Sequence, residues 1–209
     1  MLRCVRMLAV LLALGVMPTA LTVLSAPPAA AAPETPKQTI EDYYATLLKA
    51  MQNGPKLGYK GRYDLLKPAV EKTFNLTAMA QASVGAYWDS MSEPQRKALV
   101  SAFEDFTIAN YAHNFDSYDG EKFVTTSAQT TPRKDVIVYS AIVQSNGDKV
   151  SMNYLLRESD NQYKVIDIYL DGTISQLATR RSEYTSLIRQ SGVDALIQAI
   201  HKKADQLAN

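Results

Sequence analysis

The stretch Tyr163–Gly192, YKVIDIYLDGTISQLATRRSEYTSLIRQSG, decides much of the fold. Its first part, Tyr163–Leu170, is rich in Val, Ile and Tyr and predicts one β-strand. Asp171-Gly172 predicts a sharp turn, because glycine readily takes a positive φ. Thr173 then predicts a helix N-cap, with Gln176 at the capping-box position. The residues predicted to face inward on this helix recur at helical spacing: Ile174, Leu177, Ala178, Tyr184 and Ile188. The helix is predicted to end at Ser191-Gly192. The segment therefore predicts a strand joined by a turn to a helix that folds back over a sheet.

The chain upstream of this stretch begins with helical patterns. Thr35-Pro36 predicts a helix start, and Asn53-Gly54-Pro55 predicts its end. Between them, apolar residues recur at amphipathic spacing at Ile40, Tyr43, Tyr44, Leu47, Leu48 and Met51. A glycine-rich loop over 54–61 is expected next. Three further helices are predicted over Arg62–Phe74, with Pro68 kinking or dividing it, Asn75–Val84 and Ser92–Tyr111.

The middle of the chain changes to strand patterns. Strands are predicted over Lys122–Gln129, Asp135–Gln144, Lys149–Arg157 and Tyr163–Leu170. Asn146-Gly147 indicates a tight hairpin, and strands joined by short turns pair antiparallel. A last helix is predicted over Val193–Leu207. The expected class is α+β: N-terminal helices, a four-stranded antiparallel twisted sheet and two C-terminal helices.

One predicted strand, Asp135–Gln144, is apolar on both faces. Either helices cover both sides of the sheet there, or one side faces a cavity. We expect an apolar cavity between the sheet and the helices, although the sequence does not decide which sheet face lines it.

The first residues predict a targeting segment. Arg3 and Arg6 precede a short apolar run, Met7–Met17, and Ala29-Ala30-Ala31 offers small residues for cleavage. We therefore expect a cleaved signal peptide over 1–31 and a single domain over 32–209. The alternative is an uncleaved anchor, for which the apolar run is short.

Charge and cysteine content narrow the function. Removing Arg3 and Arg6 from the 22 basic residues leaves 20 against 21 acidic ones, a net charge near −1. A near-neutral chain argues against nucleic acid as the main partner. Cys4, the only cysteine, precedes the expected cleavage site, so thiol catalysis and disulfides are excluded from the mature chain.

Few residues indicate catalysis. His113 and His201 have no companions at metal-ligand spacing, so no metal or other cofactor is expected. Asp167, within the strand that begins at Tyr163, could act as a buried general base, but pairing with an Arg or a backbone N–H is the simpler interpretation. Arg180-Arg181, with Glu183, forms either a solvated face with local ion pairs or a contact for a lipid headgroup.

Several motifs, taken together, resemble the MlaC family of periplasmic phospholipid-binding proteins. They are Phe74-Asn75-Leu76, Val84-Gly85 with Trp88, YAHNF at 111–115, YKVIDIYLDGT at 163–173 and RSEY at 181–184. The stretches at 107–121 and 169–184 are most similar to the hopanoid-associated HpnM branch. Tyr163 stands where many relatives have Trp, and Asn75 where many have Asp, which leaves the lipid open between phospholipid and hopanoid.

The resemblance implies a lipid carrier without enzymatic activity. It implies an apolar cavity for lipid tails and passage through the periplasm between an inner-membrane transporter complex and an outer-membrane lipoprotein partner. Ten residues are expected to bind the lipid: Trp88, Phe103, Tyr111, Val138, Met152, Tyr154, Leu156, Ile166, Ile168 and Leu187. Two rival hypotheses stay open, an enzyme on a cone-shaped α+β fold that uses Asp167 as its base, and an envelope-assembly factor with a filled core.

Overall fold

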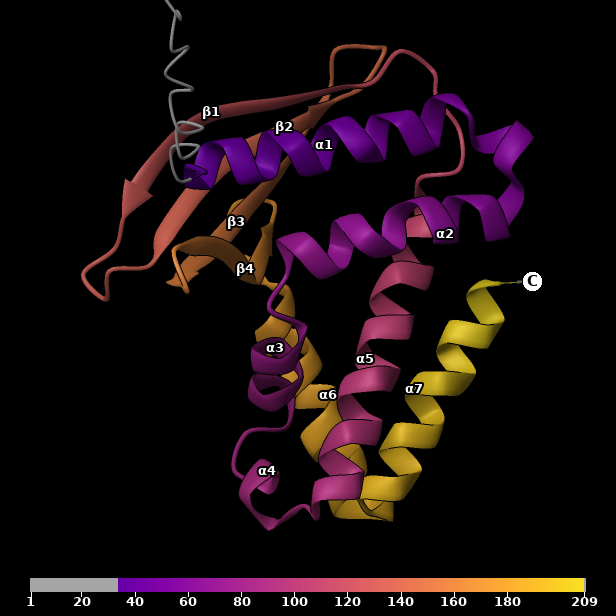
Figure 1. Cartoon of the computed structure of the whole chain (residues 1–209), viewed down its shortest axis with the longest axis vertical. Coiled ribbons are helices and arrows are strands. Elements are labelled where there is room, and N and C mark those ends of the chain that lie inside the picture. Colours follow the sequence, from indigo (N-terminus) through magenta and orange to yellow (C-terminus); the bar gives the residue numbers. More distant parts are fainter. Residues whose placement is uncertain (1–33, 209) are drawn as a thin grey trace, which may run out of the picture. The chain divides into compact units, whose positions relative to one another are not determined.

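The computed structural model describes residues 34–208. The predicted signal peptide at 1–31 therefore lies outside the described residues. The N-terminal helices are α1 (Pro36–Gln52), α2 (Gly54–Thr73), α3 (Leu76–Val84), α4 (Tyr87–Ser90) and α5 (Glu93–Asn114). The strands are β1 (Lys122–Thr130), β2 (Val136–Val143), β3 (Lys149–Ser159), β4 (Gln162–Leu170) and β5 (Ile174–Ser175). The last helices are α6 (Gln176–Ser191) and α7 (Val193–Leu207), so the predicted α+β class is confirmed (Figure 1).

The strands form one antiparallel sheet in the order β1-β2-β3-β4-β5. The prediction of four strands is corrected by the addition of β5, a two-residue strand that pairs with the end of β4. The predicted Asn146-Gly147 turn joins β2 to β3, and Gly147 has the positive φ (91°) that favours glycine. A bulge between Leu155 and Leu156 shifts the register against β4.

Helices cover one face of this sheet. Figure 1 shows α1 running across the sheet, where it contacts β1, β2 and β4. The helix α5 packs against α2, α3 and α7, and α6 packs against α3, α7 and β4. Five of the six predicted positions on the amphipathic face of α1 are buried and the sixth, Leu48, is half-buried. Thr39 and Ala50 are buried as well. The predicted cap is also present, because Thr35 Oγ1 accepts a hydrogen bond from the Gln38 N–H.

The predicted loop over 54–61 is wrong, because α2 already begins at Gly54. The helix is interrupted at Gly58, whose φ of 60° is accessible to glycine, and it runs without a break through Pro68. Arg62 stabilises the early start: its buried guanidinium donates to the carbonyl oxygens of Gly54 and Ala112, at 3.0 and 2.8 Å. The sequence pattern did not predict this long-range cation–carbonyl contact, which ties the start of α2 to α5.

The predicted N-cap of α6 at Thr173 is also wrong. Ser175 is the N-cap, and its Oγ accepts from the Ala178 N–H at 2.9 Å. The two residues before α6 instead pair with β4, which leaves Ile174 52% exposed, and Ala178 is exposed too, so neither faces inward as expected. The predicted end of the helix at Gly192 is confirmed.

Candidate functional site: an apolar hollow beside a filled core

We call the face of the sheet that the helices cover its inner face. Aromatic side chains fill the part of the inner face that lies against α1. The Tyr44 ring stacks on Phe123 at 4.6 Å and meets Tyr154 edge-on at 5.7 Å. The Tyr43 ring makes edge contacts with Phe74 and Tyr111, at 5.2 and 5.4 Å. Edge-on and offset ring contacts of this kind are favourable beyond their burial. We call this packed region the filled half of the sheet face.

The adjoining part of the same face is not filled. A hollow of about 310 Å³ lies between the sheet and the helices α3, α5 and α6. Its sheet wall consists of Val150, Met152, Ile168 and Leu170. Its helical wall includes Met79, Phe103 and Leu177, and its boundary with the filled half includes Phe74, Tyr111 and Phe115. The hollow is therefore lined mainly by alkyl and aromatic groups, as small-molecule pockets commonly are.

Polar groups lie along the α5 and α6 side of the hollow. They are Thr107, Asn110, Asn114, Gln176 and Arg180. Thr107 is satisfied within its own helix, because its hydroxyl donates to the Phe103 carbonyl at 2.7 Å. Among the described residues, the lining contains the cationic Arg180 and no acidic side chain.

Burial further disfavours ionisation of the tyrosine hydroxyls at the wall of the hollow and in the filled half beside it. It raises the pKa of Tyr111 to about 12, and it raises the pKa of Tyr154 and Tyr43 well above the ordinary value. None of these hydroxyls ionises near neutral pH, so the inner wall carries no anionic phenolate. The hollow thus combines a neutral apolar interior with one cation at its side.

The carboxylate of Asp167 is held in place by hydrogen bonds to neighbouring residues. One carboxylate oxygen accepts from the N–H groups of Ile168 and Leu177, at 2.7 and 3.0 Å, and the other accepts from the Ser175 hydroxyl at 2.6 Å. Three donors thus fix the carboxylate between β4 and the start of α6. This is the simpler of the two interpretations of Asp167 offered by the sequence, with backbone N–H groups rather than Arg as partners.

The structure brings together four of the ten expected lipid-binding residues. Phe103, Tyr111, Met152 and Ile168 line the hollow. The other six lie elsewhere: Val138, Tyr154 and Leu156 are fully buried in the core, Leu187 packs against the core from α6, Ile166 is half-buried outside the core cluster, and Trp88 lines a separate surface depression. A lipid-binding role for all ten stays a prediction.

Sequence reasoning missed the polar side of the hollow. Asn110 and Asn114 are one helical turn apart on α5, and the Asn114 amide donates to the Asn110 carbonyl at 2.8 Å. Their spacing from Thr107 and Tyr111 places all four on one helical face, a signal that could have found them. The sequence predicts Gln176 as a capping residue and Leu177 as a core position, and it assigns neither of them to a ligand site.

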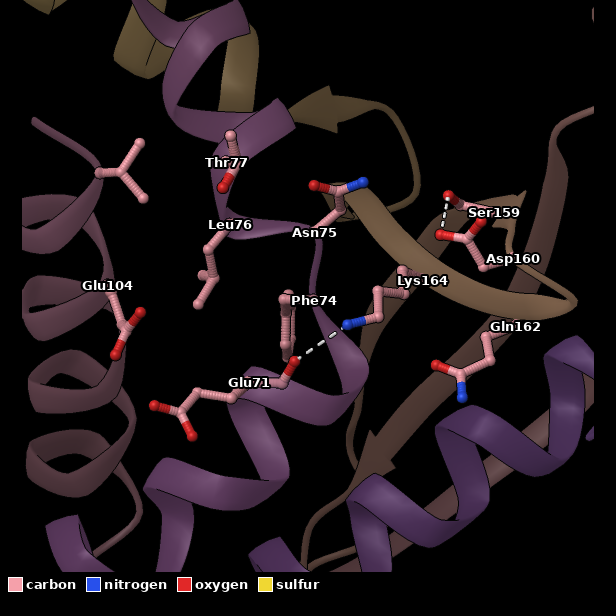
Figure 2. A pocket seen from close by; sticks show the side chains of 11 residues that line it. Glu71, Phe74, Asn75, Leu76, Thr77, Glu104, Ser159, Asp160, Gln162 and Lys164 are labelled. Atoms are coloured by element: carbon pink, nitrogen blue, oxygen red, sulfur yellow. Dashed lines mark hydrogen bonds between the residues drawn. The ribbon is translucent and has the colours of Figure 1, made fainter. Parts of the chain in front are cut away.

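A second concavity offers a contrast. The groove in Figure 2 has a volume of about 390 Å³ and is lined largely by polar and charged side chains, including Glu71, Glu104 and Asp160. Lys164 reaches across it and donates to the Glu71 carbonyl at 3.3 Å (Figure 2). Charges of both signs lie along this groove, so burial of an alkyl chain there would cost desolvation of those charges.

Neither a metal site nor a membrane span is found within 34–208. No group of three or more His, Cys, Asp or Glu residues in that range is arranged to hold a metal ion. His113 lies in the last turn of α5, where its Nδ1 is 3.1 Å from the Leu207 carbonyl oxygen. No helix in the same range combines the length and apolar character that crossing a membrane requires.

The fold is similar to that of a solved phospholipid-binding protein from Ralstonia solanacearum in complex with a phospholipid. The two structures superpose with a TM-score of 0.72 at 21% sequence identity, over 83% of this chain and 98% of the other. At that identity the likeness establishes the shared fold. The sequence profile of the MlaC protein matches residues 41–202, which is most of the chain. The chain therefore belongs to the MlaC family.

Proposed function

We propose that this protein is a lipid carrier that buries hydrocarbon in the hollow between the sheet and α3, α5 and α6. The observation that carries the proposal is the coexistence of a filled half and an unfilled apolar half on one sheet face. Apolar side chains are normally covered by close packing, so an apolar hollow of this size between the sheet and the helices needs an explanation. A lipid tail that completes the packing provides one.

The volume sets how much hydrocarbon the hollow takes. A methylene occupies roughly the volume of a liquid water molecule, about 30 Å³. The hollow of about 310 Å³ therefore holds on the order of ten methylenes. Removing ten methylenes from water contributes on the order of 8 kcal/mol, at about 0.8 kcal/mol each. One tail segment of this length therefore fits in the hollow.

Membership of the MlaC family and the phospholipid complex of the similar fold support phospholipid as the ligand. The proposed setting is the periplasm, where the carrier exchanges lipid with an inner-membrane transporter complex and an outer-membrane lipoprotein. A hopanoid is the alternative cargo suggested by the resemblance to the HpnM branch. No covalent step is needed, because reversible burial of the tail is sufficient for transport.

Native mass spectrometry after incubation with phosphatidylglycerol–phosphatidylethanolamine liposomes tests the proposal. We expect a mass increase of one phospholipid per chain, which disappears when the protein is unfolded. A protein that is empty when purified and takes up nothing from liposomes contradicts the proposal. Incubation with hopanoid-containing liposomes separates the two cargoes by mass.

A further inference from the structure

Arg180 is a half-buried cation at the hollow, and no acidic side chain of the described residues pairs with it. It lies on α6, lines the hollow and is half-buried. Its guanidinium carbon is 4.7 Å from the centre of the Phe106 ring and 5.7 Å from that of Phe103. None of the ion pairs found within 34–208 includes Arg180. The local ion pair with Glu183 that the sequence allowed is therefore not formed.

The position of Arg180 is fixed while its hydrogen-bonding capacity stays largely unused. The guanidinium lies over both aromatic rings, and Nη1 donates to the Tyr184 hydroxyl over a long 3.5 Å. A guanidinium carries five N–H donors in a rigid fork, and two of them can donate in parallel to two oxygens of a phosphate. An aromatic support that holds the fork in place lowers the entropy lost when an anion binds.

Arg180 lies near enough to Tyr111, at the wall of the hollow, for its positive charge to make a small contribution to the pKa of that residue. Burial dominates the raised pKa of Tyr111, and the positive charge of Arg180 acts in the opposite direction on the same group. The side-chain amides of Asn110 and Gln176 line the same side and add neutral donors, whereas the Asn114 amide already donates to Asn110. An anionic group at this side of the hollow would thus meet a cation and amides, while hydrocarbon attached to it would extend along the apolar walls.

We propose that Arg180 anchors the phosphate of the bound lipid, so that the site selects a phosphate-bearing lipid over an uncharged one. This inference rests on the proposed function, because it places the headgroup of the lipid whose tail fills the hollow. It deepens that function by making phospholipid the preferred cargo over an uncharged hopanoid. A charge-assisted bidentate contact supplies this selectivity, whereas tail burial alone would not distinguish the two.

Calorimetric titration with three probes tests the anchor. Decyl phosphate and decanol have the same ten-carbon chain and differ in the phosphate, while inorganic phosphate has no chain. We expect the protein to bind decyl phosphate on the order of tenfold more tightly than decanol, from the charge-assisted contact. Inorganic phosphate alone should bind far more weakly than decyl phosphate, because it buries no hydrocarbon.

Variants of α6 separate anchoring from packing. Arg180→Gln should bring the affinity for decyl phosphate close to that for decanol, because the ratio of the two affinities isolates the phosphate contact from any effect on the packing of the alkyl chain. Arg180→Lys should retain part of the preference. Arg189→Gln is the matched control, because Arg189 lies on the same helix, is exposed and does not line the hollow. It should keep the full preference.

The outcomes distinguish the anchor from the carrier function. Equal affinities for decyl phosphate and decanol, or a preference that survives Arg180→Gln, overturn the anchor and leave lipid binding intact. Inorganic phosphate that binds as tightly as decyl phosphate shows a free-anion site and also overturns it. Binding of neither alkyl probe contradicts both the anchor and the proposed function.

Discussion

The two halves of the inner sheet face are built from neighbouring residues of the same strands and have opposite packing. On β3, Tyr154 is fully buried among rings, whereas Met152, two residues earlier, lines the hollow. The helix α1 supplies aromatic rings that reach the sheet in the filled half. In the other half, α5 and α6 leave a gap between their side chains and the strands. The comparison indicates that one half stabilises the fold while the other is available to a ligand.

The largest expected effect is in the filled half. Tyr154→Ala should lower the free energy of unfolding by about 3–5 kcal/mol, because it removes a large side chain from a region without space to relax. Urea unfolding, followed by the fluorescence of Trp88, measures the change. The matched variant Met152→Ala, on the same strand, should cost clearly less because Met152 already faces a void. Equal costs for the two variants would contradict the distinction between the halves.

The second effect concerns the junction that holds α6 over the hollow. Asp167→Asn replaces one carboxylate oxygen by an NH2 group, which donates hydrogen bonds and does not accept them. The side chain can then no longer accept all three of the present hydrogen bonds. We expect a loss of about 1–3 kcal/mol in the free energy of unfolding, measured by thermal or urea denaturation. Lipid uptake per folded molecule should persist, since Asp167 does not line the hollow. Unchanged stability together with lost function would instead revive a catalytic role for this carboxylate.

The third effect tests the hollow by filling it. Leu177→Trp places a larger ring against the hollow and should weaken lipid uptake by on the order of tenfold, equivalent to about 1.4 kcal/mol. Uptake from fluorescent-lipid liposomes measures it. Ala178→Trp is the matched control, because Ala178 is the next residue on α6, is exposed and does not line the hollow. The same loss in both variants would show that the hollow is not the binding site.

The smallest effect lies outside both halves. Asp135 accepts two hydrogen bonds from the Arg157 guanidinium, at 2.7 and 2.8 Å, and this contact lowers the pKa of the carboxyl below its usual 3.8. Because the pKa is lower in the folded state, the stabilisation is complete above about pH 4 and is lost as the pH falls through the folded-state pKa. Arg157 is 57% exposed, so solvent screening limits the contribution to about 1 kcal/mol or less.

Urea titrations of the Asp135→Asn variant and the unsubstituted protein test the stabilisation by the Asp135–Arg157 contact. They are run between pH 2.5 and 7, a range that brackets the usual carboxyl pKa. The difference in stability should be largest at neutral pH and should shrink in acid. A difference that is constant across the range would mean that the carboxylate charge does not stabilise the fold. Lipid uptake should be unaffected, because neither Asp135 nor Arg157 lines the hollow.

Local patterns predicted the elements of this fold well where each element depends on its own residues. The amphipathic face of α1, its start at Thr35-Pro36, and the hairpin at Asn146-Gly147 are examples. Each rests on periodicity or on a hydrogen bond that spans a few residues. The antiparallel order of the strands followed from their short connections.

Long-range contacts account for what the sequence did not predict. The start of α2 depends on Arg62 reaching the carbonyl of Ala112, and the cap of α6 moves to Ser175 because Asp167 binds that residue and Leu177. Periodicity predicts which side chains face inward, and the resemblance places both Phe103 and Tyr154 among the lipid-binding residues. It does not show which inward side chains meet a neighbour and which meet a void, because that depends on how helices from different parts of the chain come together.

Photocrosslinking with a phospholipid that carries a diazirine near the end of one acyl chain tests the central claim most directly. After irradiation of the complex and protease digestion, mass spectrometry locates the adducts. The hollow predicts adducts on its walls, at Phe103, Met152 or Leu177, and none on fully buried Tyr154 in the filled half. Adducts confined to the polar groove of Figure 2 or to the depression around Trp88 would contradict the assignment of the hollow as the site of the lipid tail.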